Sequence, residues 1–149
     1  MRHRIDVLAV VAAGGILGTF GRWGIVRLLP HRTGGEFPIA TLLTNLLGCL
    51  LMGVLVWFVF EFWNPAHRLA RPFLGVGVLG GFTTFSTFAL DARGLAVAGR
   101  TGLALVYVTA SVVGGVLAVA VGRLVAAKLA PLPIASRQHD STADDEAEL

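Results

Sequence analysis

Charge is scarce in this sequence, and its scarcity excludes most soluble folds. Only 14% of the 149 residues are charged, 55% are hydrophobic, and the mean hydropathy is +0.76. A water-soluble domain needs a polar, charged surface that this composition does not supply. We therefore expect the chain to lie in a lipid bilayer.

Thiol and imidazole groups are nearly absent as well. The one cysteine, Cys49, lies in an apolar stretch and has no second cysteine for a disulfide or a thiolate metal site. The four histidines all lie outside the apolar stretches, so no cluster of bases or metal ligands indicates an enzyme. The pI near 10.0 comes from basic residues that flank the apolar stretches, so no nucleic-acid partner is expected.

Four long apolar stretches dominate what is present. Each is close to or above the ~17–25 residues that a helix needs to cross a bilayer, and backbone groups in hydrocarbon must be satisfied internally, which favours helices. We expect an all-α membrane protein with one domain over residues 1–130. Its crossings are expected at about 5–29, 37–62, 71–98 and 101–126. The polar, acidic segment 131–149 is expected to be a disordered tail.

The basic residues show only a weak bias towards one end of these crossings. An even number of crossings places both termini on one side, with seven basic residues: Arg2, Arg4, Arg68, Arg71, Arg123, Lys128 and Arg137. The other side has four: Arg27, Arg32, Arg93 and Arg100. Because a clear Lys/Arg excess normally marks the cytoplasmic side, this weak bias suggests insertion in both orientations. The start also resembles a signal peptide, but its helical pattern continues to Trp23, so we expect it to be retained.

A polar stripe runs along the second crossing. Its members fall at helical intervals of three and four: Thr41, Thr44, Asn45 and Gly48. In the membrane such a stripe either hydrogen-bonds to another helix or faces a watery pathway. The sequence leaves both alternatives open.

The segment Gly80–Phe88, with the sequence GGFTTFSTF, lies in the middle of the third crossing. Two glycines followed by β-branched and hydroxyl residues weaken a helix, so we expect this helix to be broken mid-membrane. Freed carbonyls at such a break can hold a small cation, and the second half-helix presents N–H groups to anions. Phe85 and Phe88 would share one face, with Ser86 and Thr87 beside them. Positive ring edges and hydroxyl donors together can replace the water around a small anion.

Arg22 lies inside the first crossing, ~7.5 Å past its middle by helical rise. An arginine at this depth is costly unless its side chain snorkels to the interface or faces a watery vestibule. In a vestibule it would raise the local anion concentration. Both alternatives stand.

With these features the chain resembles the Fluc (CrcB) family of fluoride channels. The blocks that carry the resemblance are Gly80–Phe88, Gly14–Gly18 with Arg22, and Thr41-Leu42 followed by Asn45 and Gly48. The resemblance implies a fluoride-selective channel that exports fluoride passively across the inner or plasma membrane and relieves fluoride toxicity. It also implies an antiparallel, dual-topology homodimer with a structural Na⁺ at the dimer interface.

The resemblance further implies roles for individual residues. The fluoride pathway would include Arg22, Thr41, Asn45, Phe85, Ser86, Thr87, Phe88 and Tyr107. In it, Phe85 and Phe88 would be the pore-lining aromatics and Asn45 a hydrogen-bond donor near them. Gly80 and Thr83 would offer their backbone carbonyls to Na⁺.

Two other functions are compatible with four apolar helices. A small proton-coupled multidrug exporter would need a carboxylate embedded in the membrane, whereas Asp6 and Asp91 are expected at the ends of crossings. A non-transporting structural subunit would use packing glycines equally well but has no need of the Gly80–Phe88 segment. Asp91 also stands where the resemblance leads us to expect glutamate, so the sequence leaves its role undefined.

Overall fold

The computed structural model describes residues 2–29, 35–59 and 68–129, and helical rods account for nearly all of these residues. The rods are α1 (Arg2–Leu28), α2 (Ile39–Trp57), a composite third rod, and α5 (Thr101–Leu129). The third rod consists of the π-helix η2 (Pro72–Leu79), the short α3 (Gly80–Phe82) and α4 (Phe85–Val97). All four rods are long and apolar enough to cross a membrane, which confirms the predicted all-α chain with four crossings.

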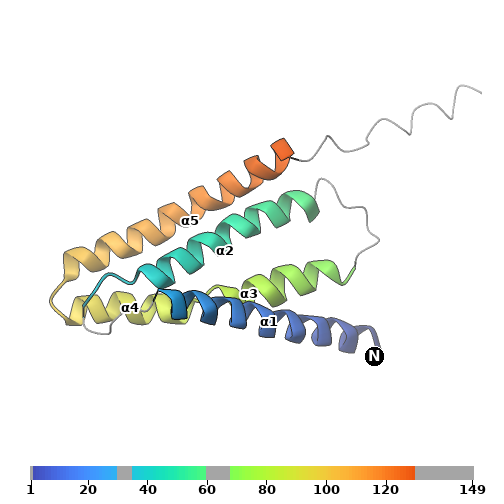
Figure 1. Ribbon diagram of the computed structural model, residues 1–149, viewed down its shortest axis with the longest axis horizontal. Helices are drawn as coiled ribbons and strands as arrows, with labels where there is room; N and C mark the ends of the chain where they lie inside the picture. The colour runs from blue at the N-terminus through green and yellow to red at the C-terminus, as the bar shows by residue number, and fades with distance from the viewer. Residues whose placement is uncertain (1, 30–34, 60–67, 130–149) are drawn as a thin grey trace, which may run out of the picture.

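Successive rods run in opposite directions along one long axis (Figure 1). The start of α1 and the end of α5 lie at the same end of the molecule, as an even number of crossings requires. The helices begin and end near the predicted bounds, although α1 already begins at Arg2 and α5 continues to Leu129. The predicted end of the second crossing at residue 62 and the predicted tail 131–149 lie outside the described residues.

Backbone contact joins α1 to the third rod. A Cβ added at Gly18 would clash with the Val78 carbonyl oxygen, and one at Gly14 would lie 2.9 Å from the Cα of Gly77. Small residues at intervals of four let helices approach this closely in lipid, where packing drives association. The glycine spacing of α1 therefore serves its contact with η2 and α3.

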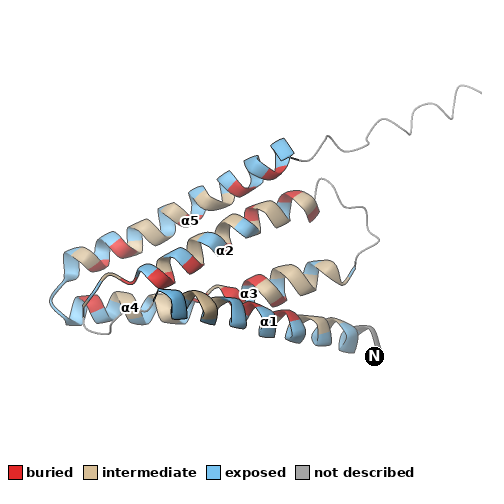
Figure 2. Ribbon diagram, in the orientation of Figure 1, coloured by how far each residue is buried: buried red, intermediate tan, exposed pale blue. Residues whose placement is uncertain are grey.

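A second backbone contact joins α2 to α5, which lie side by side (Figure 1). A Cβ at Gly53 would clash with the Val119 carbonyl oxygen, and one at Gly122 with the Leu50 carbonyl oxygen. Buried residues form narrow strips along the facing sides of the rods (Figure 2). Many large apolar side chains elsewhere are exposed, as expected for a molecule that faces lipid.

The most deeply buried side chains gather where α2 and α5 begin and α4 ends. Tyr107 is fully buried there with Leu95 and Ala104, and Phe37 and Phe88 pack against them. This core lies next to the interruption in the third rod and fixes α4 relative to α2 and α5.

Candidate functional site

The third rod is interrupted between α3 and α4, as the sequence predicted. Thr83 (φ −76°, ψ 161°) and Thr84 (φ −146°, ψ 118°) have extended backbone. In a continuous α-helix the Thr84 amide would donate to the Gly80 carbonyl. It donates instead to Asn45 Oδ1 at 2.9 Å, so the interruption releases the Gly80 carbonyl from its helical hydrogen bond.

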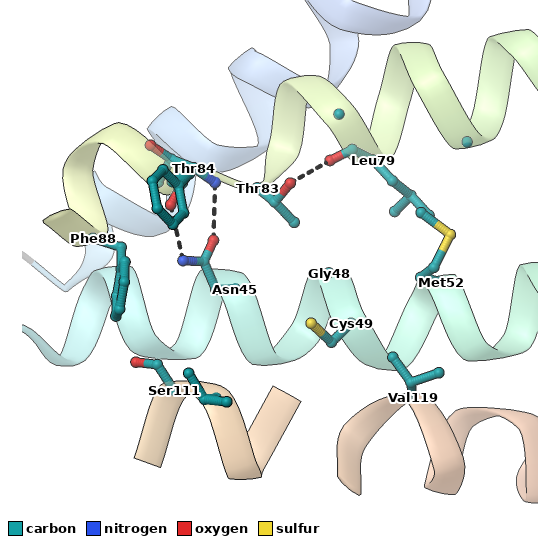
Figure 3. Close-up of a pocket in the computed structure, with 14 residues that line it drawn as sticks. Asn45, Gly48, Cys49, Met52, Leu79, Thr83, Thr84, Phe88, Ser111 and Val119 are labelled. Carbon is teal, nitrogen blue, oxygen red and sulfur yellow. Dashed lines mark hydrogen bonds between the residues drawn. The ribbon is translucent and has the colours of Figure 1, made fainter. Parts of the chain in front are cut away.

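Asn45 of α2 holds the interruption from the neighbouring rod (Figure 3). Its Oδ1 accepts from the Thr84 amide, and its Nδ2 donates to the Thr84 carbonyl at 3.0 Å. These two bonds satisfy backbone groups that would be costly to leave unpaired away from water. Of the two alternatives for the polar stripe, Asn45 makes the interhelical hydrogen bond. Because a carboxamide carries two N–H hydrogens, one remains for another acceptor.

The other members of the stripe support the same region in different ways. Thr44 is fully buried and donates to the Ala40 carbonyl of its own helix at 2.7 Å. Gly48 gives Thr83 room, since a Cβ at position 48 would clash with the Thr83 methyl group. The stripe therefore shapes the interruption, and two of its members, Asn45 and Gly48, also line the hollow beside it.

Thr84 begins α4 as its N-cap. Its Oγ1 accepts from the Thr87 amide at 3.2 Å and donates to Thr87 Oγ1 at 2.9 Å, and Ser86 Oγ lies 3.4 Å away. Thr84 was not among the predicted site residues. The available signal was a threonine three residues before another hydroxyl residue at the start of a helix.

Aromatic rings extend from the interruption into the buried core. The ring centroids of Phe85 and Phe88 are 5.7 Å apart, and those of Phe88 and Tyr107 are 5.4 Å apart. Phe37 adds a further ring, 5.7 Å from Tyr107 with the ring planes at 89°. The structure thus brings together the three aromatics predicted for the pathway, and it adds Phe37, which no pattern in the sequence marked.

The exposed fraction of the side chain falls steeply along this row of rings, from Phe85 to Tyr107. Phe85 is 80% exposed and Tyr107 is 0% exposed. Within one chain the site is therefore open at the interruption and closed at the core.

The Asp91 carboxylate lies beside Tyr107, the buried end of this row of rings. Thr41 Oγ1 donates to Asp91 Oδ2 at 2.7 Å, close to the buried Tyr107 hydroxyl, for which the described residues provide no hydrogen-bond partner. The expectation that Asp91 marks the end of a crossing is wrong. Asp91 lies within α4, partly buried against α2, because the turn of α4 directs it towards Thr41.

A hollow of about 420 Å³ opens at the interruption. Its lining includes Asn45, Gly80, Thr83, Phe88 and Ser111, several of which are labelled in Figure 3. The Ser111 hydroxyl donates to the Tyr107 carbonyl at 2.8 Å. The lining includes five residues predicted for the site, Asn45, Gly80, Thr83, Phe85 and Phe88, whereas the predicted Thr41, Ser86 and Thr87 are not part of it.

The two carbonyls predicted to bind Na⁺ are both released by the interruption. The partner that the Gly80 carbonyl would have in a helix, the Thr84 amide, is held by Asn45. The Thr87 amide, which would donate to the Thr83 carbonyl, donates to Thr84 Oγ1 instead. Free carbonyl oxygens at an unwound helix suit a small hard cation, so these residues fit the expected ion, although two ligands do not complete its coordination shell.

Arg22 stands apart from this site. Its side chain is partly exposed on α1, and it makes no hydrogen bond or ion pair with any residue that the structure describes. The vestibule and snorkelling alternatives both remain predictions.

Four apolar rods, each long enough to cross a membrane, define a small multi-pass membrane protein, and the interruption held by polar groups lies within its third rod. Residues 9–123 match the family described as CrcB-like protein, Camphor Resistance (CrcB). The chain belongs to this family, and the resemblance inferred from its motifs is confirmed.

Several relatives carry a functional name. The chain is 49% identical over 105 residues to fluoride-specific ion channel FluC 2 of Streptomyces avermitilis, covering 70% of this chain and 65% of the relative. It is 45% identical over 118 residues to FluC 1 of Streptomyces coelicolor, covering 79% and 75%. FluC of Rhodospirillum centenum is 46% identical over 117 residues, covering 76% and 92%. The match thus spans slightly less than two thirds of the first of these relatives and nearly all of the last.

Proposed function

We propose that this chain is a subunit of a fluoride-selective channel. It lets fluoride leave the cell passively across the inner or plasma membrane and so limits fluoride toxicity. The names of its relatives support this function. The observation that carries the proposal is the interruption at Thr83–Thr84, which places freed backbone groups and hydroxyls beside the rings of Phe85 and Phe88.

The chemical problem for such a channel is to replace the water that a small anion holds tightly. The first turn of α4 presents the Phe85 and Ser86 amides, which have no intrahelical acceptor, at the positive end of the helix dipole. The remaining N–H of Asn45 and the hydroxyl of Thr87 are further donors. Phenyl edges add a positive rim. Donors at fixed positions favour the smallest halide, because a larger anion cannot approach all of them.

The proposal includes a second copy of the chain in the antiparallel orientation. Phe85 is exposed and the hollow is open on one side of the single chain, so a partner is needed to close the pathway. The Gly80 and Thr83 carbonyls provide only half of a plausible Na⁺ shell, and a second copy would supply the other half. Na⁺ bound there would supply a fixed positive charge that ties the two copies together. The weak bias of basic residues supports insertion in both orientations.

Beyond the rings, Thr41 and Tyr107 continue the proposed pathway towards the end of the bundle, and Arg22 would attract anions at its mouth.

Asp91 favours one alternative, a proton-coupled multidrug exporter, because it is a carboxylate partly buried among the helices. The two functions differ in what drives transport. A channel passes fluoride down its own gradient, whereas an exporter of this kind needs a proton gradient.

Reconstitution into liposomes tests the proposal. Vesicles loaded with fluoride and supplied with a potassium ionophore should release fluoride as soon as the ionophore balances charge, with no pH gradient applied. Chloride-loaded vesicles should retain their chloride. Equal release of the two anions, or fluoride release only under a pH gradient, would overturn the proposal.

A further inference from the structure

Every polar group of Thr84 that can bind an ion is already engaged. The Thr84 amide donates to Asn45 Oδ1 at 2.9 Å, and the Thr84 carbonyl accepts from Asn45 Nδ2 at 3.0 Å. Thr84 Oγ1 accepts from the Thr87 amide and donates to the Thr87 hydroxyl. The residue is only 8% exposed. Thr84 is thus fixed from all sides and has no donor left for a passing anion.

The single hydroxyl hydrogen of Thr84 decides how its neighbours are oriented. Because that hydrogen points to Thr87 Oγ1 at 2.9 Å, Thr87 Oγ1 is the acceptor and its own hydrogen must point elsewhere. No residue that the structure describes accepts the Thr87 hydrogen. Ser86 Oγ lies 3.4 Å from Thr84 Oγ1, a long contact in which either hydroxyl could be the donor, and it is weaker than the 2.9 Å bond to Thr87.

We infer that Thr84 is a positioning residue that turns the Thr87 hydroxyl into a hydrogen-bond donor for the anion. The inference rests on the proposed function. It separates two residues that the sequence treats alike. Thr84 holds the Thr87 oxygen as an acceptor and leaves its hydrogen for an anion, whereas Ser86 has only a 3.4 Å contact with Thr84. Thr84 therefore contributes to anion recognition without touching the anion.

Fluoride efflux from liposomes tests this role in a double-mutant cycle. Thr84→Val keeps the branched shape and removes the hydroxyl, so it should slow efflux about tenfold, the effect of one hydrogen bond. Thr84→Ser keeps the hydroxyl and should stay within about twofold of the wild type. Thr109→Val, at an exposed threonine of α5 outside the hollow, is the matched control for loss of a membrane hydroxyl.

The Thr87→Val background distinguishes positioning from helix capping. If Thr84 acts through the Thr87 hydroxyl, Thr84→Val should slow Thr87→Val no further than about twofold. If Thr84 only caps α4, its bond to the Thr87 amide is lost in either background, and Thr84→Val should slow both by the same factor. That result overturns the inference, as does wild-type efflux from Thr84→Val alone.

Two further outcomes are separable. If Thr84→Val does not assemble, Thr84→Cys carries the same comparison, because a thiol is only a weak donor and acceptor. If the wild type itself passes no fluoride, the proposed function fails and the inference with it. If the wild type passes fluoride and the cycle is additive, only the inference fails.

Discussion

At the scale of single residues, the Asn45 carboxamide both accepts and donates a hydrogen bond, whereas a carboxylate in its place could only accept. Asn45→Asp would keep an acceptor for the Thr84 amide but lose the donor to the Thr84 carbonyl. An unpaired buried carbonyl costs about 1–3 kcal/mol, and the new negative charge repels an anion. We predict that Asn45→Asp slows fluoride efflux by at least about tenfold.

The control for this variant is Leu47→Ala, at an exposed position of the same helix, which should leave efflux unchanged. Size-exclusion chromatography should show the same assembly for both variants. Wild-type efflux from well-assembled Asn45→Asp would contradict the assigned role of Asn45.

The sequence predicted the residues of the site better than their bonds. Asn45, Phe85 and Phe88 could be selected because helical spacing and residue type mark them. Thr84 carries a local signal, its capping position three residues before Thr87, that was not used. Phe37 could not be selected, because its role arises from its contact with Tyr107 of another rod, which periodicity within one rod does not encode. Asp91 was misjudged for the same reason, since its hydrogen bond to Thr41 depends on how α4 packs against α2.

At the scale of helices, α1 provides an internal comparison between two glycines. A Cβ at Gly18 would clash with the Val78 carbonyl oxygen, whereas one at Gly15 has nothing within 4 Å. Gly18→Ala should therefore lower the stability by about 1–3 kcal/mol, because the obstacle is backbone. Gly15→Ala should be neutral or slightly stabilising, because alanine favours helix.

Thermal unfolding of the purified protein in detergent measures the difference. The account of the contact between α1 and the third rod requires a lower midpoint for Gly18→Ala than for Gly15→Ala. Equal midpoints would mean that α1 does not pack against η2 through Gly18.

The helices themselves followed from the sequence to different degrees. Four crossings could be predicted because apolar length alone sets them, and the interruption could be predicted because glycines and hydroxyl residues meet mid-membrane. The π-helical winding of η2, in which the Gly80 amide donates to the Gly75 carbonyl, could not. No residue type in the sequence marks a π-helix, so periodicity predicts only an ordinary helix there.

At the scale of the whole molecule, the weak bias of basic residues, seven against four, predicts insertion in both orientations. In a Cys49→Ser background, Thr101→Cys places the only thiol at the exposed start of α5. With no clear Lys/Arg bias, about half of these thiols in intact cells should react with a membrane-impermeant maleimide. Complete labelling, or none, would show a single orientation and contradict the antiparallel pair.

The central claim is that fluoride passes where the third crossing is interrupted, and Phe85 offers the most direct measurement of it. Phe85 is 80% exposed in the single chain, so Phe85→Ile keeps an apolar side chain and should not disturb folding, yet it removes the ring edge. The measurement is fluoride efflux, followed with a fluoride electrode, from two liposome samples. One contains the wild-type protein and the other an equal amount of the variant. The account predicts a slowing by at least about tenfold, or about 1.4 kcal/mol. Equal efflux from the two proteins would contradict it.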